Sequence, residues 1–67
     1  MRLVKFYGPN ERGLDHPIWI NREYVVLVRK ADDDWPGCAF IYTQNETDPI
    51  IVQGTVDVIV WDLRNAP

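Results

Sequence analysis

The chain has 67 residues, of which 46% are hydrophobic and 25% are charged, and its formal net charge at pH 7 is -3. That length holds a single domain (residues 1–67), and the composition is typical of a folded protein rather than a disordered one. The negative charge argues against nucleic acid as a partner, because nucleic-acid binders depend on a basic surface.

Cysteine and histidine occur once each, as Cys38 and His16. No internal disulfide can form, which favours the reducing cytoplasm as the location. Two such residues also fall short of the four ligands of a structural zinc, so we expect no metal and no cofactor. A domain of this size often needs extra stabilisation, and a partner subunit is the remaining source.

The first residues, Met1 to Phe6, run almost directly into the turn formers Gly8-Pro9-Asn10, without the long apolar segment of a signal peptide. Nowhere does the sequence approach the run of about 18 apolar residues that a membrane-spanning helix requires. We therefore expect no membrane span, and a protein of the cytoplasm.

Five short apolar runs predict β-strands, separated by turn-forming residues. The runs are Leu3–Tyr7, Pro17–Ile20, Tyr24–Val28, Cys38–Thr43 and Pro49–Val52. The turn Asn21-Arg22-Glu23 is expected to join the second and third runs into a tight pair, because an asparagine side chain can bond the backbone two residues on. A hairpin around residues 45–48 is expected to join the last two.

The final segment, Thr55 to Leu63, allows two readings. Its apolar residues recur at the spacing of an amphipathic helix, with Thr55 as the N-cap. Its β-branched residues favour a strand instead, and both readings stay open with the helix ahead. The predicted fold is therefore α+β, one small antiparallel sheet of four to five strands with a C-terminal helix. An all-β small barrel is the alternative.

The order of elements resembles a known family. The apolar-Asn corner Ile18-Trp19-Ile20-Asn21, the Val-rich run, the hairpin, and the entry Ile51-Val52-Gln53-Gly54-Thr55-Val56-Asp57 are similar to those of FlbD-type small flagellum-associated proteins. The same order also resembles half of a LytTR-type DNA-binding domain. The first resemblance implies a terminal helix rather than any particular activity, and the second implies a nucleic-acid-binding regulatory module.

No catalytic or metal site is predicted. Asp32-Asp33-Asp34 offers carboxylates of the kind that calcium prefers, but Trp35-Pro36 follows where a calcium loop needs regularly spaced ligands, so we expect a solvated turn. Cys38 and His16 lack a third orienting group, and we interpret them as a core residue and a loop residue. The chain is therefore expected not to be an enzyme.

Interaction with proteins is the predicted function. Both alternating sets of the Tyr24–Val28 run are apolar, so a sheet with one wet face cannot hide all of them. Tryptophan and tyrosine dominate binding hot spots. We therefore predict a non-enzymatic interaction module, either a homo-oligomer or an accessory subunit. Its expected interface residues are Trp19, Trp61, Tyr24 and Val26. The alternative is a nucleic-acid-binding module of LytTR-like type.

Overall fold

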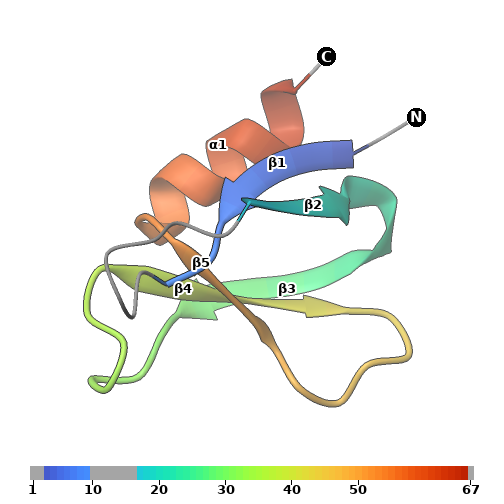
Figure 1. Cartoon of the computed structure of the whole chain (residues 1–67). Helices are drawn as coiled ribbons and strands as arrows, with labels where there is room; N and C mark the ends of the chain where they lie inside the picture. The colour runs from blue at the N-terminus through green and yellow to red at the C-terminus, as the bar shows by residue number, and fades with distance from the viewer. Residues whose placement is uncertain (1–2, 10–16, 67) are drawn as a thin grey trace.

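The computed structural model describes residues 3–9 and 17–66. Five strands, one 3-10 turn and one helix make up this part of the chain (Figure 1). They are β1 (Leu3–Tyr7), β2 (Pro17–Asn21), η1 (Arg22–Tyr24), β3 (Val25–Lys30), β4 (Cys38–Thr43), β5 (Ile50–Gln53) and α1 (Val56–Asn65). The α+β prediction is confirmed, and the all-β alternative is wrong because the last element is helical.

The strands form two antiparallel sheets rather than the single sheet expected. One is the hairpin β1–β2, and the other is the three-stranded sheet β3–β4–β5. The predicted pairing across Asn21-Arg22-Glu23 is wrong, since β2 pairs with β1 and β3 pairs with β4. The turn η1 redirects the chain from one sheet to the other. Both sheets can then bury an apolar side in the same core.

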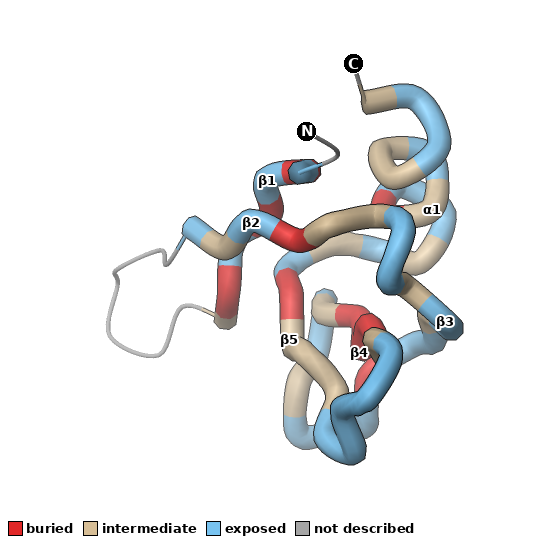
Figure 2. The backbone as a smooth tube through the Cα atoms, turned by 90° about the vertical axis from the view of Figure 1, so that its right-hand side faces the viewer, coloured by how far each residue is buried: buried red, intermediate tan, exposed pale blue. Residues whose placement is uncertain are grey.

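The core lies between the two sheets and under the helix. The hairpin contributes Val4, Phe6 and Ile20, which are 4% to 6% exposed. The three-stranded sheet contributes Ala39, Ile41 and Val52, and α1 contributes Ile59. The buried segments of Figure 2 face one another across this space. The alternation of β1, with exposed residues between buried ones, follows from one side of the hairpin facing this core.

The helix begins as the sequence predicts. Thr55 is the N-cap, and its Oγ1 accepts a hydrogen bond of 3.4 Å from the amide of Val58. Gly54 precedes it with a φ of 124°, a conformation that residues with a Cβ rarely adopt. Ile59 is 1% exposed, and Leu63 packs against the same core. The apolar stripe prevails over the strand propensity of the valines because only a helix places the whole stripe on one face.

The turn between the sheets is held by two side chains at its N-terminal end, those of Asn21 and Arg22. Asn21 Oδ1 accepts a 3.0 Å hydrogen bond from the amide of Glu23, which confirms the predicted bond to the backbone two residues on. Arg22 Nη1 donates to the carbonyl of Leu63 at 3.3 Å and to that of Ala66 at 2.8 Å. These carbonyls belong to the end of α1, where acceptors lack partners within the helix. Arg22 thereby joins the turn η1 to the end of α1.

The boundaries of the third strand differ from the prediction. Tyr24 belongs to η1, and the strand runs on through Lys30. An irregularity in register between Val25 and Leu27 interrupts the alternation of the strand. Val26 and Leu27 are consequently both exposed, at 65% and 49%. The hairpin between β4 and β5 is confirmed, with Asn45 at a φ of 67° in its turn.

Candidate interaction site

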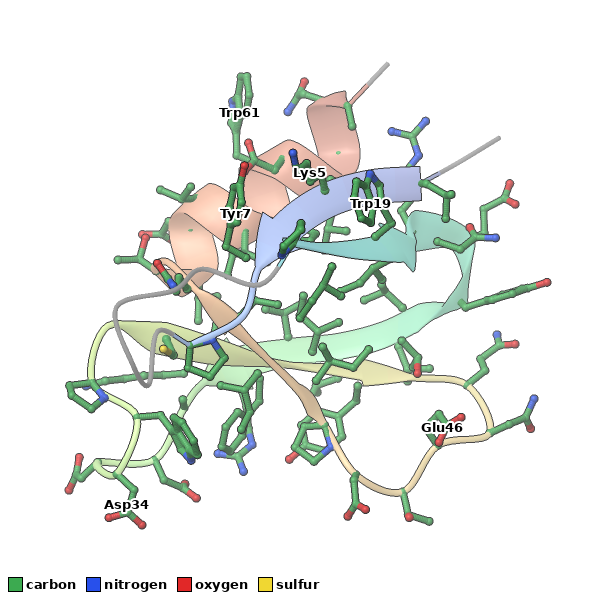
Figure 3. All side chains as sticks on the ribbon, viewed as in Figure 1. Lys5, Tyr7, Trp19, Asp34, Glu46 and Trp61 are labelled. Atoms are coloured by element: carbon green, nitrogen blue, oxygen red, sulfur yellow. The ribbon has the colours of Figure 1, made fainter. Side chains whose placement is uncertain are left out.

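Three exposed aromatic side chains surround one lysine on the side formed by β1, β2 and α1. Tyr7 is 42% exposed, Trp19 is 56% exposed and Trp61 is 64% exposed. Figure 3 shows them beside Lys5 in the upper part of the molecule. We call Lys5, Tyr7, Trp19 and Trp61 the aromatic face. Isolated apolar side chains are common on protein surfaces, whereas rings gathered around a cation form a patch that is typical of binding sites.

The backbone of the hairpin places the lysine among the rings. Lys5 lies directly opposite Trp19 in the register of β1 and β2, and Tyr7 lies two residues along the same side of β1. The Nζ of Lys5 is 5.3 Å from the centroid of the Tyr7 ring and 5.5 Å from a ring centroid of Trp19. Both distances fall within the range of cation–π attraction.

The helix supplies the third ring. Trp61 and Lys5 line one shallow surface hollow of about 340 Å³, together with Val4, Asp62, Asn65 and Ala66. Asn65 Nδ2 donates a 2.8 Å hydrogen bond to the carbonyl of Trp61. Residues from opposite ends of the sequence thus share one surface, and that surface carries both a cation, Lys5, and an anion, Asp62.

The other two predicted interface residues lie on different elements. Tyr24, in η1, is 57% exposed, and Val26 lies at the irregularity of β3. β3 is an edge strand of its sheet, and we call Tyr24, Val26 and Leu27 the β3 edge. The four predicted residues are all exposed, but they belong to two surfaces rather than one.

A second cation covers the outer side of the three-stranded sheet. The guanidinium carbon of Arg29 lies 4.8 Å from the Phe40 ring centroid and 5.7 Å from that of Tyr42. Its Nε and Nη2 donate to the Tyr42 hydroxyl at 3.2 Å and 3.1 Å. This hydrogen bonding is the main cause that raises the pKa of Arg29 above its ordinary value. Phe40 is only 5% exposed. The side chain of Arg29 therefore lies over the outer rings of β4, whereas Trp19, Val26 and Leu27 remain exposed to solvent.

The other residues considered as metal ligands or nucleophiles are the run Asp32-Asp33-Asp34, Cys38 and His16. Asp32, Asp33 and Asp34 are exposed in the connection between β3 and β4, and Asp32 Oδ1 lies 3.6 Å from Arg29 Nη1. Cys38 begins β4 and is half-buried, while His16 lies outside the described residues. Within residues 3–9 and 17–66, no three His, Cys, Asp or Glu side chains are grouped as metal ligands would be. In that same part of the chain, no helix has the length and apolarity to cross a membrane.

No family model, curated protein or solved structure matches this chain. A function for the chain must therefore be inferred from its surfaces. Sequence reasoning selected Trp19 and Trp61 for their size but missed Lys5, which interrupts the apolar run Leu3–Tyr7. The signal for Lys5 is its outward position on β1, two residues before Tyr7 and opposite Trp19. This position can be recognised only once β1 is known to pair with β2.

Proposed function

We propose that the chain is a non-enzymatic protein-interaction module that self-associates through the aromatic face. The observation that carries the proposal is the grouping of Tyr7, Trp19 and Trp61 around Lys5, with the rings exposed. Large amphipathic rings lose little conformational freedom on binding and supply much contact area, which is why they act as anchors. Docking of the same face onto a larger protein, as an accessory subunit, is the other form of this role.

A second copy is the economical partner because the face complements itself in charge. In a two-fold dimer, each contact from residue i of one copy to residue j of the other is repeated from j to i. Lys5 and Asp62 border the same hollow. Two copies can therefore place Lys5 of each against Asp62 of the other, with the tryptophans packed between the two pairs.

A dimer interface would occupy only a small part of the surface of the chain. A specific interface of standard size buries about 800 Å² on each partner. The chain exposes 4994 Å² in total, so such an interface would use about a sixth of its surface. The aromatic face draws its residues from two strands and a helix of a molecule with a longest dimension of 31 Å.

Sedimentation velocity over a wide concentration range tests the proposal. We expect a concentration-dependent dimer, weakened about 30-fold or more by Trp61→Ala or Trp19→Ala, the usual effect of truncating an anchor. Tyr24→Ala is the matched control, because Tyr24 is equally exposed but lies outside the aromatic face. A monomer at all concentrations, or equal weakening by Tyr24→Ala, contradicts the proposal.

A charge exchange sharpens the test. Lys5→Glu alone sets like charges together across the two-fold axis and should weaken the dimer, as should Asp62→Lys alone. The double variant restores opposite charges at each position and should recover association, because coupled residues give non-additive effects. If the double variant is weaker than either single one, Lys5 and Asp62 do not meet across the interface.

A further inference from the structure

A second surface, which adjoins the aromatic face at Tyr7 but contains neither Trp19 nor Trp61, forms an open groove at the C-terminal end of β1. It measures about 730 Å³ and lies where the segment after β1 reaches the connection between β3 and β4 (Figure 1). Its walls combine rings and prolines, namely Tyr7 and Pro9 on one side with Trp35 and Pro36 on the other. Asp34, at the tip of the β3–β4 connection in Figure 3, also lines it.

Backbone hydrogen bonds hold the walls of this groove in place. The amide of Gly54 donates to the carbonyl of Gly37 at 2.8 Å, which ties the β3–β4 connection to the start of the helix. The amide of Trp35 donates to the carbonyl of Asp32 at 2.9 Å. Gln53 Nε2 donates to the carbonyl of Gly8 at 2.6 Å, which ties the end of β5 to the segment after β1. A groove fixed in advance costs a ligand less ordering when it binds.

The position of the groove favours one type of backbone. Tyr7 ends β1, Cys38 begins β4 and Gln53 ends β5, so the groove crosses the ends of strands rather than following a free edge. A peptide bound there cannot extend a sheet by regular backbone pairing. A polyproline II segment needs no such pairing, since it makes no internal hydrogen bonds and presents its rings and carbonyls outward. Grooves lined by aromatic rings are the sites that such segments occupy.

The charge of the groove selects among proline-rich ligands. Asp34 lines it, Asp33 is exposed beside it, and no basic side chain among the described residues contributes to the lining. An arginine or lysine of a ligand would meet a carboxylate there, whereas an acidic ligand or a nucleic acid would be repelled. We propose that this groove binds a proline-rich peptide carrying basic residues, in the polyproline II conformation.

The chemistry of each wall fits that ligand. The rings of Tyr7 and Trp35 offer flat apolar surfaces on which proline rings can pack. The indole N–H of Trp35 is a donor for the exposed carbonyls of a polyproline II backbone. Pro9 and Pro36 add rigid apolar surface without donors of their own. The groove and the aromatic face share Tyr7 but not their tryptophans, so substitutions of Trp35 and of Trp19 distinguish peptide binding from self-association.

Fluorescence anisotropy with labelled synthetic peptides tests the inference on the full chain. The probe is a peptide of about ten residues with repeated Pro-x-x-Pro spacing and two terminal arginines, long enough at about 3.1 Å per residue to cross the groove. The matched probe has glutamates in place of the arginines. We expect saturable binding of the arginine peptide and binding of the glutamate peptide that is at least about tenfold weaker.

Variants locate the site. Trp35→Ala should weaken binding about tenfold or more, and Trp35→Phe less, because phenylalanine keeps the ring but not the N–H. Asp34→Asn should reduce the preference for arginine over glutamate and should matter less at high salt. Trp19→Ala is the control that disturbs the aromatic face and should leave peptide affinity unchanged. Circular dichroism establishes that each variant is folded.

Several results would overturn the inference. The first is the absence of saturable binding up to about 1 mM peptide, which corresponds to a binding free energy of only about 4 kcal/mol. The second is equal affinity for the two peptides. The third is an equal loss of affinity from Trp19→Ala and Trp35→Ala. A preference for single-stranded nucleic acid over the arginine peptide would assign the rings to base stacking instead. Self-association that persists in Trp35→Ala while peptide binding is lost would separate this site from the proposed function.

Discussion

On two outer surfaces of the molecule a cation lies beside aromatic rings, but the rings are exposed on one surface and partly buried on the other. On the aromatic face, Lys5 lies near the rings of Tyr7 and Trp19, and both rings stay exposed. On the three-stranded sheet, Arg29 lies over the rings of Phe40 and Tyr42, and Phe40 is buried. A cation beside aromatic rings therefore does not by itself say whether a surface is closed or open.

The difference follows from the shape of the cation. The guanidinium of Arg29 is planar, so it can cover a ring while its edge donates two hydrogen bonds to the Tyr42 hydroxyl. The ammonium of Lys5 is a compact, strongly hydrated charge on a flexible stem. The rings beside Lys5 stay at least 42% exposed, whereas Arg29 lies over a ring, that of Phe40, which is 5% exposed. The closed surface stabilises the monomer, and the open one suits association.

The largest contrast is expected from truncating one ring on each surface. Phe40→Ala should lower the free energy of unfolding by about 3 kcal/mol, because it leaves a cavity beneath Arg29. Trp19→Ala should change it by no more than about 0.5 kcal/mol, as is usual at exposed positions, while it weakens association. Urea denaturation at low protein concentration measures both. Equal losses in the free energy of unfolding would show that both rings stabilise the monomer, which contradicts the contrast between the two surfaces.

A smaller effect is expected from the cations. Arg29→Ala should lower the melting temperature by a few degrees, and Arg29→Lys by less, since lysine keeps the charge but not the planar contact. Lys5→Ala should leave the melting temperature of the monomer unchanged. Tyr42→Phe provides the control, because it removes only the hydroxyl that accepts from Arg29. Its effect should overlap with that of Arg29→Lys rather than add to it, and simple additivity would contradict the proposed cover.

The smallest expected effect is that of divalent cations. Asp32 already lies near Arg29, and the run Asp32-Asp33-Asp34 is exposed, so calcium at about 5 mM should leave the melting temperature unchanged, because only a ligand that binds the native state stabilises it. Magnesium at the same concentration is the parallel measurement. A clear upward shift would mean that these carboxylates bind a metal instead of assisting Arg29.

Local patterns made much of the fold predictable. The β-branched and aromatic runs located the strands, and the spacing from Val56 to Leu63 with Thr55 before it located the helix. The division into two sheets was missed because Asn21-Arg22-Glu23 carries the residues of a tight turn, whereas the chain forms a 3-10 turn there. Nothing local in the sequence indicates that Arg22 bonds to carbonyls more than 40 residues away.

The surfaces were harder to predict than the elements. Trp19 and Trp61 were predicted as anchors because they are bulky and lie beside apolar neighbours in the sequence. The lysine near them became visible only when the pairing of β1 with β2 set Lys5 opposite Trp19. Arg29 lies over the buried ring of Phe40, whereas the sequence suggested Arg29 only as the end of a strand. The groove that we propose binds a peptide joins residues of three segments, and such a grouping depends on tertiary structure rather than on any spacing along the chain.

The bonds from Arg22 to the end of the helix also bear on the order of folding. Each sheet is built from strands that are neighbours in sequence, and contacts of that kind form quickly. The bonds of Arg22 to Leu63 and Ala66 close loops of 41 and 44 residues and gain little until both sheets are in place. An interaction made after the rate-limiting step slows unfolding without speeding folding. We therefore expect the bonds of Arg22 to prolong the lifetime of the assembled protein rather than to shorten the time it takes to form.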